Sequence, residues 1–128
     1  NRNDFMSLIQ INDNRPDDIK AIQWLAFASN AFNVMVPFYA DIETTPDYLS
    51  NTTGEVSTDN FYWSSRMIAA MADASYKKSI FHIERYQEHV LSKGHEIINR
   101  YDDMIQNEAD TDKHLALKHE ANLLSLIC

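Results

Sequence analysis

The fold turns on residues 78–107, which read KSIFHIERYQEHVLSKGHEIINRYDDMIQN. Apolar residues recur in this stretch at intervals of seven: Ile83, Val90, Ile97 and Met104. Such a repeat predicts one long helix that packs against a neighbouring helix with a left-handed crossing. At ~1.5 Å per residue the helix would reach about 45 Å. Gly94 interrupts it beside the apolar stripe, which predicts either a close approach of another segment or a local kink.

A shorter helix is expected on each side of this stretch. Upstream, Ser57, Thr58 and Asp59 are good N-caps, and apolar residues follow at helical spacing, which predicts a helix over residues 59–76. Downstream, Asp110 and Asp112 are expected to cap a helix over residues 112–127. Its apolar side is predicted to comprise Leu115, His119, Leu123, Leu126 and Ile127.

The first half of the chain has a different pattern. Residues 5–12 and 21–28 are short apolar runs bounded by turn residues, and they predict two strands. Residues 29–58 are predicted to be irregular, with Pro37 holding Val36 extended. The fold class is therefore α+β, with two strands and three mainly long helices. Two strands are too few for a sheet that stands alone, so they need partners from further sequence or from another chain.

Composition narrows the possible functions. The chain has 128 residues and only two glycines, against an average near ~7%, which disfavours a P-loop or a dinucleotide-binding fingerprint. A formal charge of −8 disfavours nucleic acid and anionic membranes as partners. We expect no membrane-spanning segment and no signal peptide. The single cysteine, Cys128, leaves no internal disulfide, which suits a cytoplasmic protein.

The histidines do not fall at metal-binding spacing. His82 and His89 lie two helical turns apart, roughly 10 Å, which is too far to share one ion. His114 and His119 are five residues apart, a poor spacing for shared ligation on a helix. We therefore expect no metal and no cofactor, and all five histidines are predicted to be solvated: His82, His89, His95, His114 and His119.

Acidic residues are predicted to be solvated as well. Residues 13–18, DNRPDD, superficially suggest a calcium loop, but Arg15 stands third and Trp24 twelfth, where ligands are required. Carboxylates near the end of the long helix are expected on exposed surface: Asp102, Asp103, Glu108, Asp110 and Asp112. The aromatic cluster at residues 61–63 is predicted to pack into the loop before it.

Three segments, residues 22–39, 41–49 and 57–66, are more specific. They contain a strand ending in Trp-Leu-Ala, a Val-Pro-Phe-Tyr loop, a Thr-Pro-x-Tyr turn and a helix that opens with Tyr-Trp. In this order they resemble the C-terminal part of the cysteine dipeptidases of lactic acid bacteria, peptidase family C69. The resemblance covers about residues 5–70, and the later helices agree in character more than in motif.

The resemblance implies a piece of an N-terminal nucleophile hydrolase, built as an αββα sandwich. In that mechanism an N-terminal cysteine attacks the substrate carbonyl and its own α-amino group, with a pKa of about 7.7–8.0, serves as base. This chain begins with Asn1, and Cys128 is its only cysteine. We therefore expect one C-terminal piece, with strands and loop at 1–58 and helices at 59–128. Its nucleophile would lie upstream of residue 1, and the isolated fragment would be inactive.

The resemblance also suggests site residues and partners. Asn33, Val36, Pro37 and Tyr39 are predicted to approach the substrate cleft, although a structural loop explains them equally well. Arg2 precedes the first strand, where related acylases place a catalytic arginine, and its alignment stays open. The implied partners are dipeptide substrates, the N-terminal part of the same chain and a second copy in a homo-oligomer.

Two other function classes remain. The first is a non-enzymatic interaction or oligomerisation module whose seven-residue stripe forms the interface. The second is a metal-binding helical protein, which the histidine spacing and the single cysteine oppose.

Overall fold

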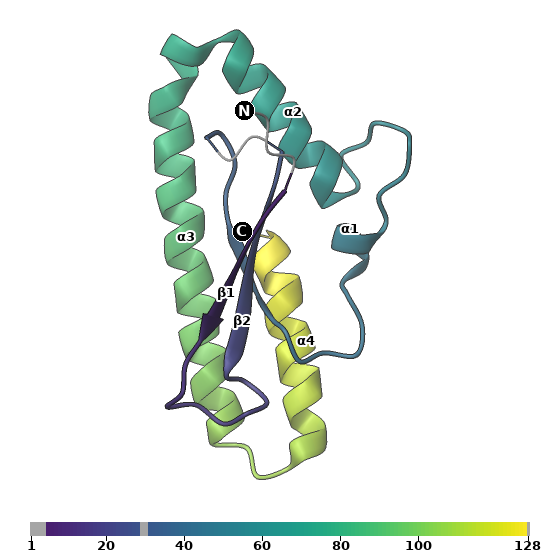
Figure 1. Ribbon diagram of the computed structural model, residues 1–128, viewed down its shortest axis with the longest axis vertical. Coiled ribbons are helices and arrows are strands. Elements are labelled where there is room, and N and C mark those ends of the chain that lie inside the picture. Colours follow the sequence, from purple (N-terminus) through teal and green to yellow (C-terminus); the bar gives the residue numbers. More distant parts are fainter. Residues whose placement is uncertain (1–4, 29–30, 128) are drawn as a thin grey trace.

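The computed structural model describes residues 5–28 and 31–127, without the side chain of Ile127. Arg2 and Cys128 lie outside the described residues, so their predicted roles have no structural counterpart. The described chain forms one antiparallel sheet and four helices, which confirms the α+β class (Figure 1).

The sheet has the order β1-β2-β3, formed by β1 (Phe5–Ile11), β2 (Ala21–Phe27) and β3 (Val36–Tyr39). The first two strands confirm the sequence prediction. The third strand corrects it, because β3 lies in the segment predicted to be irregular. Proline has no N–H to donate to a ladder and is therefore confined to edge strands, and Pro37 lies opposite Trp24 in an edge strand of this sheet.

The helices are α1 (Asp47–Ser50), α2 (Phe61–Ala74), α3 (Tyr76–Gln106) and α4 (Thr111–Ile127). The three long helices were predicted, whereas the single turn of α1 was not. The N-cap of α2 is Asn60, whose side chain accepts a hydrogen bond from the Trp63 backbone N–H at 2.9 Å. It is not one of the three caps expected upstream. The indole N–H of Trp63 reaches back to the Thr53 carbonyl at 2.9 Å, which confirms that this aromatic cluster packs onto the preceding loop.

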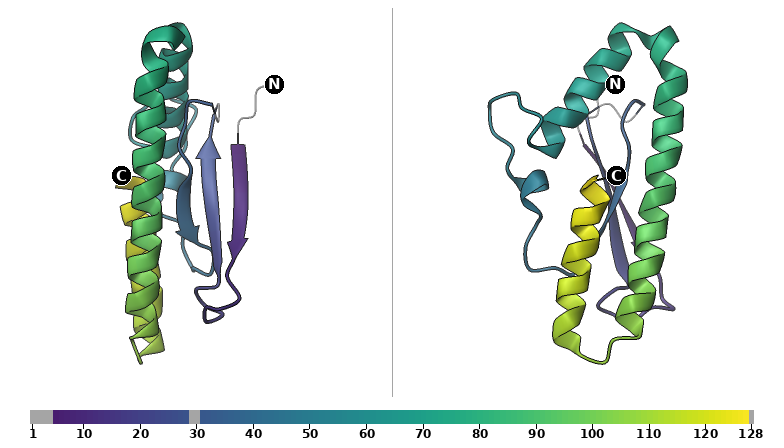
Figure 2. Two further views of the ribbon diagram at one scale, coloured as in Figure 1. Left: turned by 90° about the vertical axis from the view of Figure 1, so that its left-hand side faces the viewer. Right: turned by 180° about the vertical axis from the view of Figure 1, so that it is seen from behind.

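The sheet stands beside a layer of helices, as Figure 2 shows in its left-hand view. β3 is next to the helices and packs against both α3 and α4, whereas β1 is the outermost strand. Every residue of β1 is exposed, including Leu8 at 57% and Ile9 at 64%. Because successive strand residues point to opposite faces, both faces of β1 are uncovered.

The buried face of α3 follows a straight helix rather than a seven-residue repeat. Val90 and Ile97 are buried as predicted, but Met104 is 43% exposed and Ile105 takes its place in the core. Buried positions along α3 step by three and four residues, and α3 packs on both α4 and β3, so the predicted contact with a neighbouring helix is present. A Cβ at Gly94 would lie 2.9 Å from Pro37 Cδ, so the close approach predicted as one alternative is confirmed.

The buried face of α4 differs from the predicted one. Leu123 is 41% exposed, while Ala121 is fully buried together with three polar residues: Lys118, Asn122 and Ser125. The prediction failed because hydrophobicity alone ranks these polar side chains as outward-facing. Each has a partner inside the protein, as buried polar groups require. None of the helices in the described part of the chain is long and apolar enough to cross a membrane.

Candidate functional site

The four predicted substrate residues lie on or just before β3, and the structure buries all of them. Asn33 is 5% exposed, Val36 2% and Tyr39 1%, and Pro37 is among the fully buried side chains. The segment is held in place by Gln87 of α3, whose amide donates to the Asn33 carbonyl at 2.9 Å. β3 is therefore covered by other parts of this chain. Contact of these four residues with substrate stays a prediction.

A buried polar network surrounds the end of β3. The Tyr39 hydroxyl donates to Asp102 Oδ1 at 2.6 Å, and Arg15 Nε lies 3.5 Å from the other carboxylate oxygen. Burial raises the pKa of Tyr39, and the hydrogen bond to Asp102 raises it further, so this hydroxyl stays protonated. Burial also raises the pKa of Asp102, while Tyr39 and Arg15 oppose that shift. The network ties the β1–β2 loop, β3 and α3 together.

A second set of hydrogen bonds closes the outer edge of β3. Asn122 of α4 accepts from the Tyr39 backbone N–H at 2.8 Å and donates to the Tyr39 carbonyl at 3.4 Å. The side-chain amide thus acts as a short substitute for a neighbouring strand. Because Asn122 is fully buried, these bonds form without competition from water.

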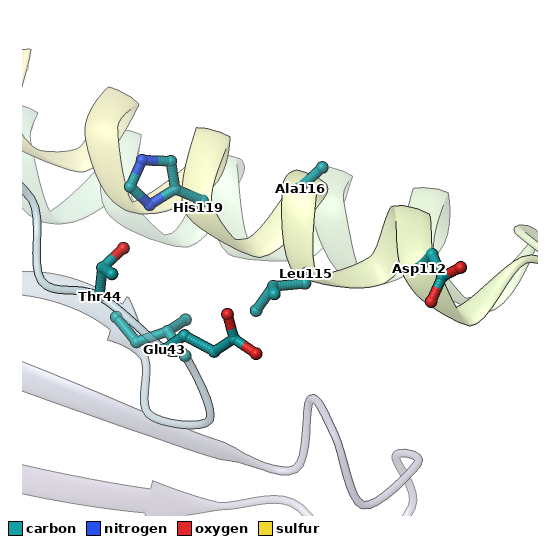
Figure 3. A pocket seen from close by; sticks show the side chains of 7 residues that line it. Glu43, Thr44, Asp112, Leu115, Ala116 and His119 are labelled. Atoms are coloured by element: carbon teal, nitrogen blue, oxygen red, sulfur yellow. The ribbon is translucent and has the colours of Figure 1, made fainter.

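An open cleft lies next to this network, between α4 and the segment that follows β3 (Figure 3). Its volume is about 270 Å³. Figure 3 shows Glu43 and Thr44 on one wall, with Asp112, Leu115, Ala116 and His119 along the helix. The carboxylates of Glu43 and Asp112 are hydrogen-bond acceptors, and apolar surface comes from Ile42, Leu115 and Ala116. None of the four predicted substrate residues lines this cleft.

The described residues contain no nucleophilic cysteine, because Cys128 lies outside them. Among residues 5–28 and 31–127, no group of three histidine, cysteine, aspartate or glutamate side chains could hold a metal ion. His82, His89 and His95 are exposed, whereas His119 is half-buried in the wall of the cleft. The contacts of Tyr39, Gln87 and Asn122 hold the β3 segment against α3 and α4.

Asp102 and His114, both predicted to be solvated, instead contact groups inside the protein. Asp102 is 5% exposed, and it shares a helical face with the buried Ile98 and Ile105, so helical spacing could have revealed it. His114 contacts Asp18 Oδ2 at 2.8 Å and the Glu108 carbonyl at 2.7 Å. No sequence signal could have paired His114 with Asp18, because the two residues are 96 positions apart.

Comparison with known proteins gives a consistent result. The family model "Peptidase family C69" matches residues 1–89, which include the whole sheet, α1, α2 and the first part of α3. The chain is 44% identical over 99 residues to "Probable dipeptidase A" of Streptococcus pyogenes serotype M3 (strain SSI-1), a match that covers 77% of this chain and 21% of that protein.

Two further relatives extend this likeness. "Dipeptidase" of Bifidobacterium longum (strain NCC 2705) is 42% identical over 105 residues, which are 82% of this chain and 20% of that protein. "Probable dipeptidase B" of Lactococcus lactis subsp. lactis (strain IL1403) is 33% identical over 120 residues, which are 94% of this chain and 25% of that protein. The chain thus spans between a fifth and a quarter of the length of these relatives.

Proposed function

The chain belongs to peptidase family C69, and on that basis we propose that it is a C-terminal scaffold part of a cysteine dipeptidase. In this proposal the complete enzyme hydrolyses dipeptides through an N-terminal cysteine that residues 1–128 do not contain. The observation that carries the proposal is the 42–44% identity to dipeptidases over more than three-quarters of the chain.

The exposure of β1 supports the proposal that these residues are one part of a larger fold. Five large apolar side chains of this strand are between 36% and 65% exposed: Phe5, Met6, Leu8, Ile9 and Ile11. A protein that folds alone rarely leaves so continuous an apolar surface open. We propose that the remainder of the same chain covers β1 and completes the αββα sandwich that the resemblance implies.

Residues 1–58 and 59–128 act, in this proposal, as one structural unit. β3 of the first part lies against α3 and α4 of the second, and Asn122 bonds both backbone groups of Tyr39. Tyr39 bonds in turn to Asp102 on α3. These interlocking contacts support a single scaffold rather than two independent domains.

We propose that four residues on or just before β3 lie beside the substrate cleft of the complete enzyme: Asn33, Val36, Pro37 and Tyr39. Their burial supports a role through the position of β3 rather than through direct contact with solvent-borne substrate. The close approach of Pro37 to Gly94 supports this role, because it holds β3 directly against α3.

The alternative of a helical interaction module has less support. It relied on a seven-residue stripe left free for a partner helix. In the structure Val90 and Ile97 of that stripe are buried in this chain's own core, and Met104 alone of the four is strongly exposed.

The test is an activity assay on the isolated 128-residue chain with a panel of dipeptides, in which released amino acids are measured. We expect no release, because the thiol and α-amine that the mechanism needs on one residue are absent. The Cys128→Ala variant serves as the matched control. Release by the wild-type chain that disappears in this variant would overturn the proposal and make the Cys128 thiol catalytic.

A further inference from the structure

His114, in the first turn of α4, joins two loops at one end of the molecule. Its Nδ1 lies 2.8 Å from Asp18 Oδ2, in the loop between β1 and β2. Its Nε2 lies 2.7 Å from the backbone carbonyl oxygen of Glu108, in the loop between α3 and α4. The His114 side chain is 17% exposed, so both contacts are partly shielded from water.

The two partners fix the number of protons on the ring. A backbone carbonyl oxygen only accepts hydrogen bonds, so Nε2 carries a proton. An ionised carboxylate also only accepts, so Nδ1 carries a proton as well. The contacts therefore select the imidazolium form of His114. In agreement, the Glu108 carbonyl and then Asp18 raise the pKa of His114, while partial burial and the Lys118 charge oppose the rise.

Lys118, one turn later on α4, holds the same loop by a different bond. Its Nζ donates to the backbone carbonyl of Asp18 at 3.1 Å and lies 3.6 Å from the Asp41 carboxylate. Its side chain is only 5% exposed. This anchor does not depend on the protonation of His114.

Each segment packed against His114 places a charged or polar group near its ring. Asp18 faces it from the β1–β2 loop and Lys118 from its own helix. Glu108 presents its carbonyl, while its carboxylate accepts from the Asp110 backbone N–H at 3.1 Å. Asp41 interacts with Lys118, because its carboxylate lies 3.6 Å from Lys118 Nζ. Asp18 is thus the only carboxylate that contacts the ring among the described residues.

We propose that His114 is a pH-sensitive clasp that ties the β1–β2 loop and the α3–α4 loop to the start of α4. In the imidazolium form, the two ring N–H groups of His114 hold both loops. Loss of one ring proton removes the positive charge that attracts the Asp18 carboxylate and leaves one ring nitrogen with a lone pair that faces an acceptor, so the hold on the two loops weakens. Lys118 keeps the loop backbone near α4, which makes the change a local loosening at the end of the hairpin that carries β1.

The direction of the pH dependence follows from the raised pKa. A histidine that gains partners on folding contributes stability that is complete below its unfolded pKa of about 6.5. That contribution is lost as the pH rises through the higher pKa of the folded state. The clasp is therefore closed under mildly acidic conditions and opens toward alkaline pH.

The test is an NMR titration of the labelled 128-residue chain from about pH 5 to pH 9. We expect the ring signals of His114 to titrate above the ordinary histidine pKa of about 6.5. The backbone amide signals of Asp18 and Ile19 should move with the same midpoint. Asp18→Asn should lower that midpoint, and His114→Gln should abolish the amide movement.

His119→Gln is the matched control, because His119 lies on the same helix and takes no part in the contacts of His114 with Asp18 and Glu108. This variant should leave the midpoint of His114 and the amide movement unchanged. A His114 midpoint at or below about 6.5 in the wild-type chain would overturn the proposal. Backbone amide signals of Asp18 and Ile19 that do not move as His114 titrates would overturn it as well. Both outcomes are read in the wild-type chain, so the proposal remains testable even if a variant fails to fold.

Discussion

Gly94 and Pro37 meet where α3 crosses β3, and their contact sets the distance between helix and sheet. A Cβ at position 94 would lie 2.9 Å from Pro37 Cδ and 3.3 Å from the Trp24 ring. Both neighbours are rigid and buried, so neither can yield cheaply. Glycine is required here for space, although it costs a helix interior about 1 kcal/mol relative to alanine.

Gly94→Ala should lower the free energy of unfolding by about 1 kcal/mol, because overpacking a tight contact outweighs the gain in helix propensity. Urea unfolding measures the change. Gly54→Ala is the matched control, since nothing lies within 4 Å of a Cβ at that position. Equal or higher stability of Gly94→Ala compared with that control would show that α3 and β3 do not approach as described.

Tyr39→Phe tests the buried network at the same scale. Removal of the hydroxyl leaves Asp102 with Arg15 as its remaining partner, so we expect a loss of about 2 kcal/mol. Tyr76→Phe, at a site that is 53% exposed, should change stability by less than about 0.5 kcal/mol. Equal effects of the two substitutions in thermal unfolding would contradict the network.

Residue-scale prediction from sequence succeeded at Gly94, a residue that is unfavourable in a helix interior. The close approach at Gly94 was among the expectations because a mid-helix glycine needs a reason. Asp102 and His114 were misplaced because charge normally indicates solvent. Their partners, Tyr39 and Asp18, are brought to them only by the tertiary fold.

At the scale of elements, α3 and β1 differ strongly in how many of their residues are buried. α3 buries seven residues between Val90 and Ile105, whereas no residue of β1 is buried. Local opening costs least where few apolar contacts are lost. We therefore expect α3 to resist local opening more strongly than β1 in the isolated chain.

Hydrogen exchange on the isolated chain should show this difference directly. We expect the slowest amides between Ile83 and Met104, above all in the buried half from Val90 onward. The amides of β1 should exchange fastest among the strands and long helices. Slower exchange in residues 5–28 than in α3 would contradict this assignment of the core.

Element boundaries were predictable where a long apolar pattern specifies them, as for β1, β2 and the three long helices. β3 was not, because it has four residues, includes Pro37, and has its outer edge satisfied by a side chain 83 positions away. The buried face of α4 was missed for a related reason. Its polar residues are buried because other elements supply their partners.

At the scale of the whole molecule, the apolar surface of β1 predicts self-association of the isolated chain. A second copy can pair with the open strand edge or cover its faces. Sedimentation at high micromolar concentration should show a dimer. The double variant Leu8→Lys and Ile9→Lys, which places a charge on each face of β1, should be monomeric. A monomeric wild-type chain at that concentration would contradict the prediction.

The central claim is that this chain supplies the C-terminal scaffold of a dipeptidase, and a chimeric enzyme tests it most directly. In the chimera, the 128-residue chain replaces the matching segment of the Streptococcus pyogenes relative, to which it is 44% identical over 99 residues. The measurement is the rate of amino-acid release from a dipeptide panel. The account predicts hydrolysis that disappears when the proposed N-terminal cysteine nucleophile of the chimera is changed to alanine. A chimera that folds and yet releases no amino acids, while the unmodified relative does, would contradict it.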